Sequence, residues 1–197
     1  MQIRLLSPRL LLRPYMAADA EDLYAAVSES VQTVGQWTSW CHVGYSKPEN
    51  FSRISYFQST WQSQEAFEFA VLDYAGAFVG GVGLSDYDRV RRSATLGYWT
   101  RQSRQRDGIA REAVTRVLRF GFEALRLSRI KVIIAVANLA SRKVTERAGG
   151  CFTCVIPDFL AIGNAIYSAA VYECHPTSSW RALANRAPRN PPATFGI

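Results

Sequence analysis

The stretch "ATLGYWTRQSRQRDGIAREAVTRVLR" (residues 94–119) decides the fold of this chain. Its pattern predicts a strand, then a short basic loop, then a long amphipathic helix that begins at Gly108-Ile109-Ala110. A glycine lets the backbone approach a ligand closely, and the first turn of a helix presents unpaired N–H groups to anions. The loop places Arg101, Arg104 and Arg106 beside this turn. The segment is therefore predicted to cradle a pyrophosphate.

Length and composition favour one globular domain. The chain has 197 residues and a mass of 22.0 kDa, with 48% hydrophobic and 20% charged residues, which are globular values. We see no apolar run long enough to span a bilayer and no signal-peptide pattern, so we expect a cytoplasmic protein without a membrane partner. We expect the domain to occupy residues 1–175. The Pro/Arg-rich tail at 176–197 is expected to be poorly ordered, with one short helix at 180–184.

The net charge of +7 permits a nucleic-acid or acidic partner but does not decide function. Several arginines lie in the loop described above, where a phosphate-bearing ligand would use them, so nucleic acid is disfavoured as the substrate. Cys151 and Cys154 have a C-x-x-C spacing, but no second pair or neighbouring histidine completes a metal site. We therefore expect no metal, and we interpret the four cysteines as small buried hydrophobic residues.

Hydrophobic periodicity predicts alternating strands and helices around one central sheet, which is an α/β fold. The predicted strands cover residues 10–13, 67–73, 78–84, 94–100, 130–136, 152–156 and 166–174. The predicted helices cover residues 19–28, 48–62, 108–125 and 138–148, with an irregular aromatic segment at 31–41 and a polar connection at 86–92. We expect a mixed, mostly antiparallel twisted sheet, with a parallel strand pair across the crossover at 94–136.

Five motifs in order resemble those of the GNAT N-acetyltransferases, in particular the ribosomal-protein N-acetyltransferase type. These motifs are "RLLLRP" (9–14), "GQWTSW" (35–40), "LGYW" (96–99), "QRDGIA" (105–110) followed by Glu112-Ala113, and "NLASRKV" (138–144) followed by Glu146 and Ala148-Gly149. The six-residue loop motif alone is weak, but the ordered set spans residues 9–174. Two positions depart from the family pattern, because Arg106 and Asp107 stand where the family usually has Gly and a basic residue. Asp107 could instead cap the following helix.

The resemblance implies a GNAT fold with a splayed strand pair that holds acetyl-CoA as cosubstrate. It further implies direct attack of a primary amine on the thioester, with a protein or peptide N-terminus as the expected acceptor. A small-molecule amine is the alternative, and a non-catalytic acyl-CoA-binding or ribosome-associated module is a second alternative from a different class. Relatives commonly dimerise, so a homodimer is one partner that the resemblance suggests.

The resemblance also assigns candidate residues. The catalytic candidates are Ser141 as thiolate proton donor, Tyr98, and Asp86 as general base, with Asp88, Glu65 and His42 as alternative bases. Ser141 fits a helix-surface serine equally well, and Asn138 fits a simple N-cap. The acceptor pocket is predicted at Trp37, Trp40, His42 and Tyr56. The acetyl-CoA candidates are Trp99, Thr100, Arg101, Gln105, Arg106, Asp107, Gly108, Ile109, Ala110, Asn138, Ser141 and Lys143.

Overall fold

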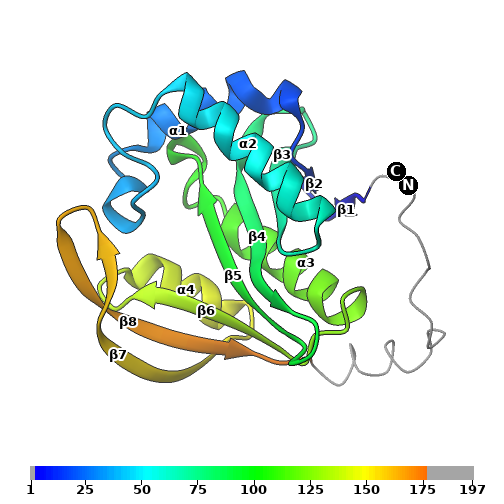
Figure 1. Cartoon of the computed structure of the whole chain (residues 1–197), viewed down its shortest axis with the longest axis vertical. Coiled ribbons are helices and arrows are strands. Elements are labelled where there is room, and N and C mark those ends of the chain that lie inside the picture. Colours follow the sequence, from blue (N-terminus) through cyan, green and yellow to red (C-terminus); the bar gives the residue numbers. More distant parts are fainter. Residues whose placement is uncertain (1–2, 177–197) are drawn as a thin grey trace.

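A computed structural model describes residues 3–176 as one eight-stranded sheet flanked by helices (Figure 1). The strand order is β1-β2-β3-β4-β5-β6-β8-β7, and every neighbouring pair is antiparallel except β5–β6. The strands are β1 (Leu5–Leu6), β2 (Leu10–Pro14), β3 (Phe67–Asp73), β4 (Phe78–Asp88), β5 (Ser93–Thr100), β6 (Arg129–Ala135), β7 (Cys151–Ile162) and β8 (Ala165–Cys174). The α-helices are α1 (Ala20–Ser30), α2 (Lys47–Gln62), α3 (Ile109–Glu123) and α4 (Leu139–Arg147). Short 3-10 turns cover Ala17–Asp19, Gly35–Trp37 and Gln102–Arg104.

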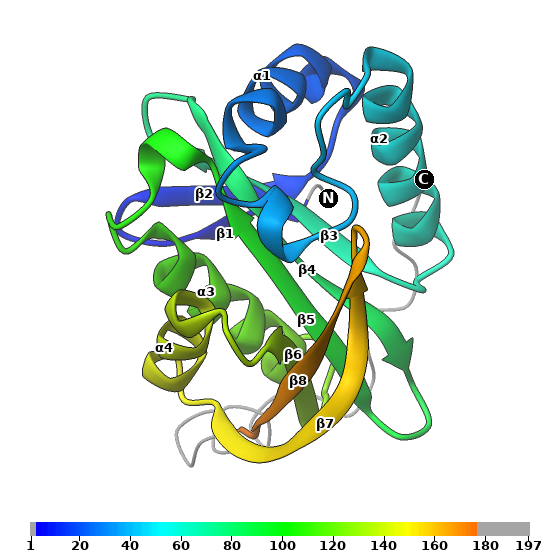
Figure 2. The same cartoon turned by 90° about the vertical axis from the view of Figure 1, so that its left-hand side faces the viewer.

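Two apolar clusters hold the sheet between its helices. Alternation along β3 sends Phe69 and Val71 toward α3, where Phe120 packs against Phe69 with ring centroids 5.3 Å apart. The intervening Ala70 and Leu72 pack in the second cluster with α1 and α2. The α1–α2 pair therefore covers one face and α3 covers the other (Figure 2).

The parallel pair at the centre of the sheet is short. β5 and β6 pair only at Ser93–Arg129, Ala94–Ile130 and Thr95–Lys131. Beyond these pairs β5 continues to Thr100 beside β4, and β6 continues to Ala135 beside β8. The two strands diverge in Figure 1, so a wedge opens in the middle of the sheet.

The seven predicted strands and all four predicted helices are confirmed, with differences at several boundaries, and the short edge strand β1 (Leu5–Leu6) was not predicted. β4 extends to Asp88, so the connection predicted at 86–92 is shorter, and β7 is more than twice as long as the strand predicted at 152–156. The helix starts follow the capping residues: Ser46 accepts a hydrogen bond from the Glu49 N–H at α2, and Asn138 accepts one from the Ser141 N–H at α4.

The prediction that all four cysteines are buried is wrong for two of them. Cys41 and Cys174 are buried, whereas Cys151 and Cys154 are exposed on β7, which is an edge strand of the sheet. The helix predicted at 180–184 and the rest of the tail from residue 177 lie outside the described residues. Within residues 3–176, no helix is both long enough and apolar enough to cross a membrane.

Candidate functional site

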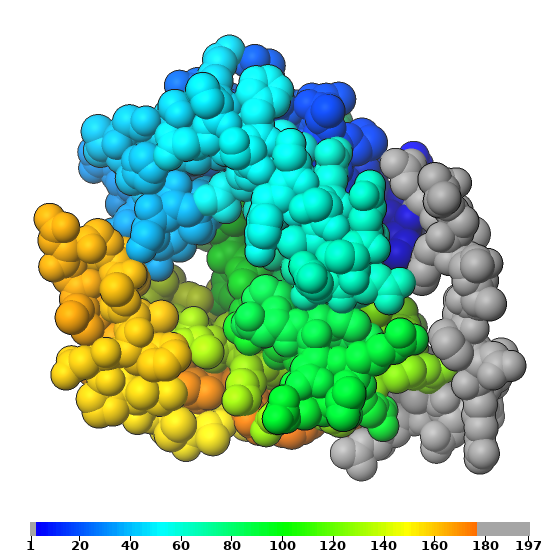
Figure 3. Space-filling model, in the orientation of Figure 1, coloured from blue at the N-terminus to red at the C-terminus, as the bar shows by residue number. Residues whose placement is uncertain are grey.

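The diverging strands β5 and β6 form the floor of a cleft with a volume of about 1580 Å³. Its walls come from the loop before α2, the start of α3, α4 and the β7–β8 hairpin. Figure 3 shows the molecule hollowed between the yellow and orange β7–β8 hairpin and the strands beside it. The cleft brings together most of the residues that the sequence predicts for the site: Trp37, Trp40, Tyr98, Trp99, Thr100, Gln105, Arg106, Gly108, Ile109, Ala110, Asn138 and Ser141.

The backbone before α3 presents free N–H groups to this cleft. Within residues 3–176, no hydrogen bond engages the N–H groups of residues 106–111, and Gly108 at the N-cap has no side-chain cap. Gly108 has φ +77° and Arg106 has φ +68°, so the loop turns through two left-handed residues. Such a run of N–H groups at a helix start is a ready anion site, and it fits the pyrophosphate of acetyl-CoA.

The loop arginines are mostly neutralised by the protein itself. The Arg101 guanidinium lies 2.6 Å from Glu29 and does not line the cleft. The Arg104 guanidinium lies 2.8 Å from Asp73, and this hydrogen bond lowers the pKa of the Asp73 carboxyl. Arg106 has no ion pair among the described residues and is exposed. The backbone therefore supplies most of the free anion-binding capacity of this loop, with Arg106 beside it.

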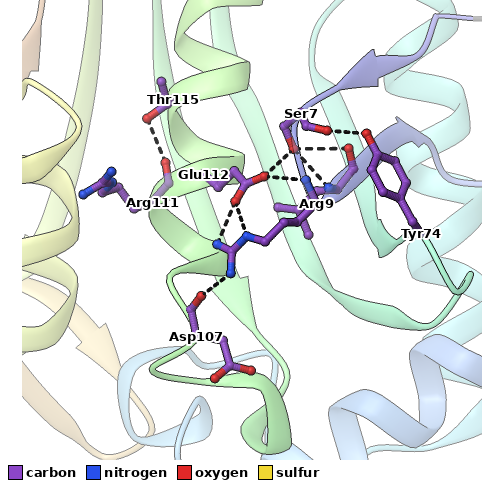
Figure 4. Close-up of polar contacts among 8 residues, drawn as sticks. Ser7, Arg9, Tyr74, Asp107, Arg111, Glu112 and Thr115 are labelled. Carbon is purple, nitrogen blue, oxygen red and sulfur yellow. Dashed lines mark hydrogen bonds and ion pairs between the residues drawn. The ribbon is translucent and has the colours of Figure 1, made fainter.

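A polar clamp joins the first two strands to this loop (Figure 4). The Glu112 carboxylate accepts hydrogen bonds from the Ser7 hydroxyl at 2.7 Å and from the Arg9 N–H at 3.0 Å, and it pairs with the Arg9 guanidinium at 2.7 Å. Arg9 Nη1 donates to the Asp107 carbonyl oxygen at 2.9 Å, and the Tyr74 hydroxyl donates to the Ser7 carbonyl oxygen. Glu112 thereby fixes the position of the turn that carries the free N–H groups.

Asp107 does not cap α3. Its carboxylate makes no hydrogen bond to the helix start and lies 3.8 Å from Arg104, and the Gly108 that precedes α3 carries no side chain to cap it. Arg9 binds the Asp107 carbonyl oxygen from the opposite side. The capping role considered from the sequence is therefore wrong, and Asp107 leaves the N–H groups open.

Tyr98 and Ser141 meet in the lining of the cleft. The Tyr98 hydroxyl lies 2.7 Å from the Ser141 hydroxyl, 2.9 Å from the Ser141 carbonyl oxygen and 3.3 Å from the Thr145 hydroxyl. Burial raises the pKa of Tyr98, so its hydroxyl stays protonated and able to donate. The amide oxygen of Asn138 caps α4 at the Ser141 N–H, 3.1 Å away, and Asn138 lines the cleft as well.

Glu68 is a residue that sequence reasoning missed. It lies on β3 opposite Gly83 of β4 and lines the cleft, and burial raises the pKa of its carboxyl to about 7 against the effect of the nearby Arg53 cation. A Cβ at Gly83 would collide with the Glu68 carboxylate, so this glycine of β4 makes the space for Glu68. Gly81 does the same for the Tyr15 hydroxyl and the Trp99 ring. A lone carboxylate inside the apolar run "FEFAVL" (67–72) was the available signal.

Aromatic rings wall the same end of the cleft as Glu68. The Trp40 and Trp99 rings lie 5.4 Å apart edge to face, and the Arg53 guanidinium lies over the Trp40 ring at 4.3 Å. Trp37 contacts Tyr167 of β8, with ring centroids 6.3 Å apart. The Ser39 hydroxyl donates to the Ala161 carbonyl oxygen of β7 at 3.1 Å, so the β7–β8 hairpin contacts the loop before α2 that carries Trp37 and Trp40.

Several predicted residues do not line the cleft. His42 is exposed and lies 3.1 Å from Glu49, Tyr56 is exposed on α2, and Lys143 is exposed on α4. Asp86 lies near the end of β4 that pairs with the start of β5, whereas the Gly80–Thr100 end of the same pair reaches the cleft. Arg101 and Asp107, and the alternative bases Glu65 and Asp88, are also outside the lining.

Comparison with known proteins identifies a family that this chain matches. The family model described as an acetyltransferase (GNAT) domain matches residues 9–150. YdaF of Bacillus subtilis (strain 168), provisionally named a ribosomal N-acetyltransferase, is 32% identical over 155 residues and covers 75% of each chain. A second Bacillus subtilis protein, YoaA, is 25% identical over 169 residues, which cover 83% of this chain and 92% of that protein.

Solved structures agree on the fold. Mycobacterium smegmatis RimJ in complex with CoA-disulfide superimposes with a TM-score of 0.82 at 22% identity, covering 93% of each chain. RimL, a ribosomal L7/L12 alpha-N-protein acetyltransferase in complex with coenzyme A, superimposes with a TM-score of 0.83 at 17% identity, covering 88% of this chain and 98% of RimL. At these identities the likeness establishes the fold alone.

The family uses acetyl-CoA, which fits the free N–H groups before α3 and the open edges of β5 and β6. Among the described residues, no group of three His, Cys, Asp or Glu side chains could hold a metal ion. The family match covers most of the chain, and the strand–loop–helix of residues 94–119 lies inside it. The chain belongs to the GNAT family of N-acetyltransferases.

Proposed function

We propose that this protein transfers the acetyl group of acetyl-CoA to the α-amino group at the N-terminus of a peptide or protein. The observation that carries the proposal is the pair of opposed proton-handling groups in one cleft, with Glu68 among the aromatic rings and Tyr98–Ser141 beside α4. An amine that attacks a thioester must lose a proton, and the departing thiolate must gain one. The name of YdaF supports the ribosomal-protein class of acceptor.

The acetyl-CoA-binding part of the proposal rests on backbone groups. The N–H groups of residues 106–111 would receive the pyrophosphate, and the unpaired edges of Leu96–Thr100 and Val132–Ala135 would flank the pantetheine arm. Asn138 has its amide nitrogen available while its oxygen caps α4. Trp99 and Thr100 contribute through the backbone of β5, and the Trp99 ring packs on the acceptor side against Trp40.

Glu68 is proposed as the general base, in place of Asp86 and the other loop carboxylates. Its pKa of about 7 lies just below the pKa of about 8 of a free α-amino group, so a proton can pass between them near neutral pH. The proton leaves the ammonium for Glu68, directly or through one water. The freed nitrogen lone pair then forms the amide bond at the thioester carbon.

Tyr98 and Ser141 are proposed to supply the proton that the sulfur needs. The Tyr98 hydroxyl would donate to Ser141 Oγ while Ser141 Oγ–H donates to the sulfur, as the carbon–sulfur bond breaks. One proton passes from the amine to Glu68, and one passes from Tyr98 through Ser141 to the sulfur. Glu68 then releases its proton to solvent and Tyr98 takes one up, which restores the starting state. The products are the acetylated amine and CoA with a free thiol.

Mass spectrometry of peptides incubated with acetyl-CoA tests the proposal. We expect a single acetyl group on the N-terminus, and no acetylation of N-terminally blocked peptides that contain lysine. Glu68→Gln is expected to lower kcat by about 100-fold, whereas the matched control Glu65→Gln, exposed and outside the cleft, keeps wild-type activity. Acetylation of lysine in blocked peptides at an equal rate would contradict the N-terminal acceptor.

A further inference from the structure

Arg53 is a cation in the acceptor end of the cleft that the proposed reaction does not use. Its guanidinium lies over the Trp40 ring at 4.3 Å and 5.7 Å from the centre of the Phe57 ring. Both rings hold its position, because a planar guanidinium stacks well on an aromatic face. Arg53 also lines the cleft together with Glu68, Trp40 and Phe57.

The charge of Arg53 is not neutralised by the described part of the protein. Within residues 3–176, no carboxylate lies within 4.0 Å of the guanidinium, although eleven other ion pairs form there. Among the same residues its Nε is buried without a hydrogen-bond partner, while the guanidinium interacts with the Tyr45 hydroxyl, a neutral group. Burial raises the pKa of the Tyr15 and Tyr45 hydroxyls, the Cys41 thiol and the Glu68 carboxyl, and the Arg53 cation opposes part of each rise. Arg53 also opposes the rise in the pKa of His42 that its hydrogen bonds cause. A partly buried cation without a counterion is costly unless a ligand supplies the anion.

Glu68 and Arg53 place an acidic and a basic side chain in the same cleft. The cation influences Glu68 electrostatically, yet the two side chains form no ion pair. Glu68 is assigned to the acceptor's amine, which leaves Arg53 to face another part of the acceptor. An occupant that carries both an ammonium and an anion would satisfy both residues.

We propose that Arg53 selects acceptors that carry a carboxylate close to the reacting amine, namely peptides with Asp or Glu among their first three residues. This inference rests on the proposed function. The Arg53 guanidinium lies 4.3 Å from the Trp40 ring, and the Trp40 ring lies 5.4 Å from the ring of Trp99 on β5. These two distances separate Arg53 from the strand beside which the thioester is proposed to react. An extended peptide advances about 3.3 Å per residue, so its first three residues stay within that reach.

A matched peptide panel tests the selectivity of the wild-type enzyme. The peptides share one sequence with an amidated C-terminus and carry Asp, Asn or Lys at position one, two or three. We expect kcat/KM to be at least about tenfold higher for Asp than for Asn at the best position, equivalent to about 1.4 kcal/mol, and lowest for Lys. Equal rates for Asp and Asn at all three positions, or a preference for Lys, would overturn the proposal.

Variants assign the selectivity to Arg53. Arg53→Met keeps an apolar contact with Trp40 but removes the charge, and it is expected to reduce the Asp-to-Asn ratio of kcat/KM to about twofold or less. Arg53→Lys is expected to keep part of the preference, and Arg89→Met, an exposed control in the β4–β5 turn, to keep all of it. Thermal melting and acetyl-CoA binding report whether each variant folds. An unchanged preference in folded Arg53→Met overturns the assignment.

The outcomes separate this inference from the proposed function. Turnover of peptides without a charge preference refutes the role of Arg53 and leaves N-terminal acetylation standing. Equal loss of activity toward all peptides in Arg53→Met would show a general positioning role and also refutes the selectivity. Absence of turnover with every peptide refutes the proposed acceptor and, with it, the inference built on that acceptor.

Discussion

The Tyr98 and Ser141 hydroxyls lie 2.7 Å apart, although the two residues are 43 positions apart in the chain. One comes from the strand that diverges from β6 and the other from the first turn of α4. Their contact joins the two sides of the wedge at the depth where the thioester is proposed to react. It turns two separate candidates into one hydrogen-bonded unit.

Removal of either hydroxyl tests this unit. Ser141→Ala and Tyr98→Phe are each expected to lower kcat by about 100-fold with little change in the Kd of acetyl-CoA. Because the two groups act in series, the double variant should lose little more than either single variant. Tyr56→Phe, at an exposed tyrosine outside the cleft, is the control. Additive losses in the double variant would speak against a shared proton path.

Glu68 predicts a pH dependence of activity. Since the pKa of Glu68 is about 7, kcat/KM should rise as pH increases through about 7 and the carboxyl loses its proton. Glu68→Gln should remove this step from the profile. A step that persists in Glu68→Gln would assign it to another group.

The same residue predicts a pH dependence of stability. The folded-state pKa of Glu68 is raised from 4.5 to about 7, so the folded protein holds this proton more tightly than the unfolded chain. Stability from Glu68 is therefore fully present below pH 4.5 and is lost as pH rises to about 7. The free energy of unfolding of Glu68→Gln, measured relative to that of the wild type, should therefore be higher at pH 8 than at pH 5, by an amount on the order of 3 kcal/mol. Thermal or denaturant unfolding at the two pH values measures this, and a constant difference would contradict it.

Arg106 predicts a stabilising substitution. It holds φ +68°, a left-handed conformation that costs a non-glycine residue about 1 kcal/mol. Arg106→Gly should therefore raise the melting temperature by about 2 °C, although it weakens acetyl-CoA binding by removing an exposed positive charge. Asp107→Gly, at a neighbour without positive φ, should not raise it. A lower melting temperature for Arg106→Gly would refute this account of the loop.

The clamp around Glu112 predicts a binding defect. Glu112→Ala removes the acceptor of bonds from Ser7 and Arg9, which hold the turn before α3. We expect a loss of about 1–3 kcal/mol of stability and a KM for acetyl-CoA that rises more than kcat falls. Glu123→Ala, which removes an ion pair with Arg119 at the far end of α3, is the control for helix charge. A change in kcat alone would place the effect elsewhere.

Local sequence signals predicted the elements well. The Gly108 turn, the Asn138 cap and the Gly149 exit from α4 all act within a few residues, so the sequence carries their signals directly. Asp86 and His42 lie outside the cleft for a different reason. Each lies in a segment whose position relative to the cleft depends on strand register or on a neighbour such as Glu49.

The position of Glu68 and the ion pairs of the loop arginines could not be predicted from the sequence, because both depend on tertiary structure. Glu68 fits between the strands only because Gly83 of the adjacent strand has no side chain beside it. Arg101 and Arg104 looked like phosphate ligands, but Glu29 and Asp73, far away in sequence, neutralise them. Long-range pairings of this kind are set by the packed fold and leave no periodic trace in a single sequence.

The early end of the β5–β6 pairing places two free strand edges in the middle of the sheet. Free edges normally lie at the rim, where they invite other chains to add a strand. Here α3, α4 and the β7–β8 hairpin line the cleft into which they open, so a ligand reaches them only from inside the cleft. Their amides should exchange with solvent as readily as those of a rim strand, and a bound acetyl-CoA should slow that exchange much as an added strand would.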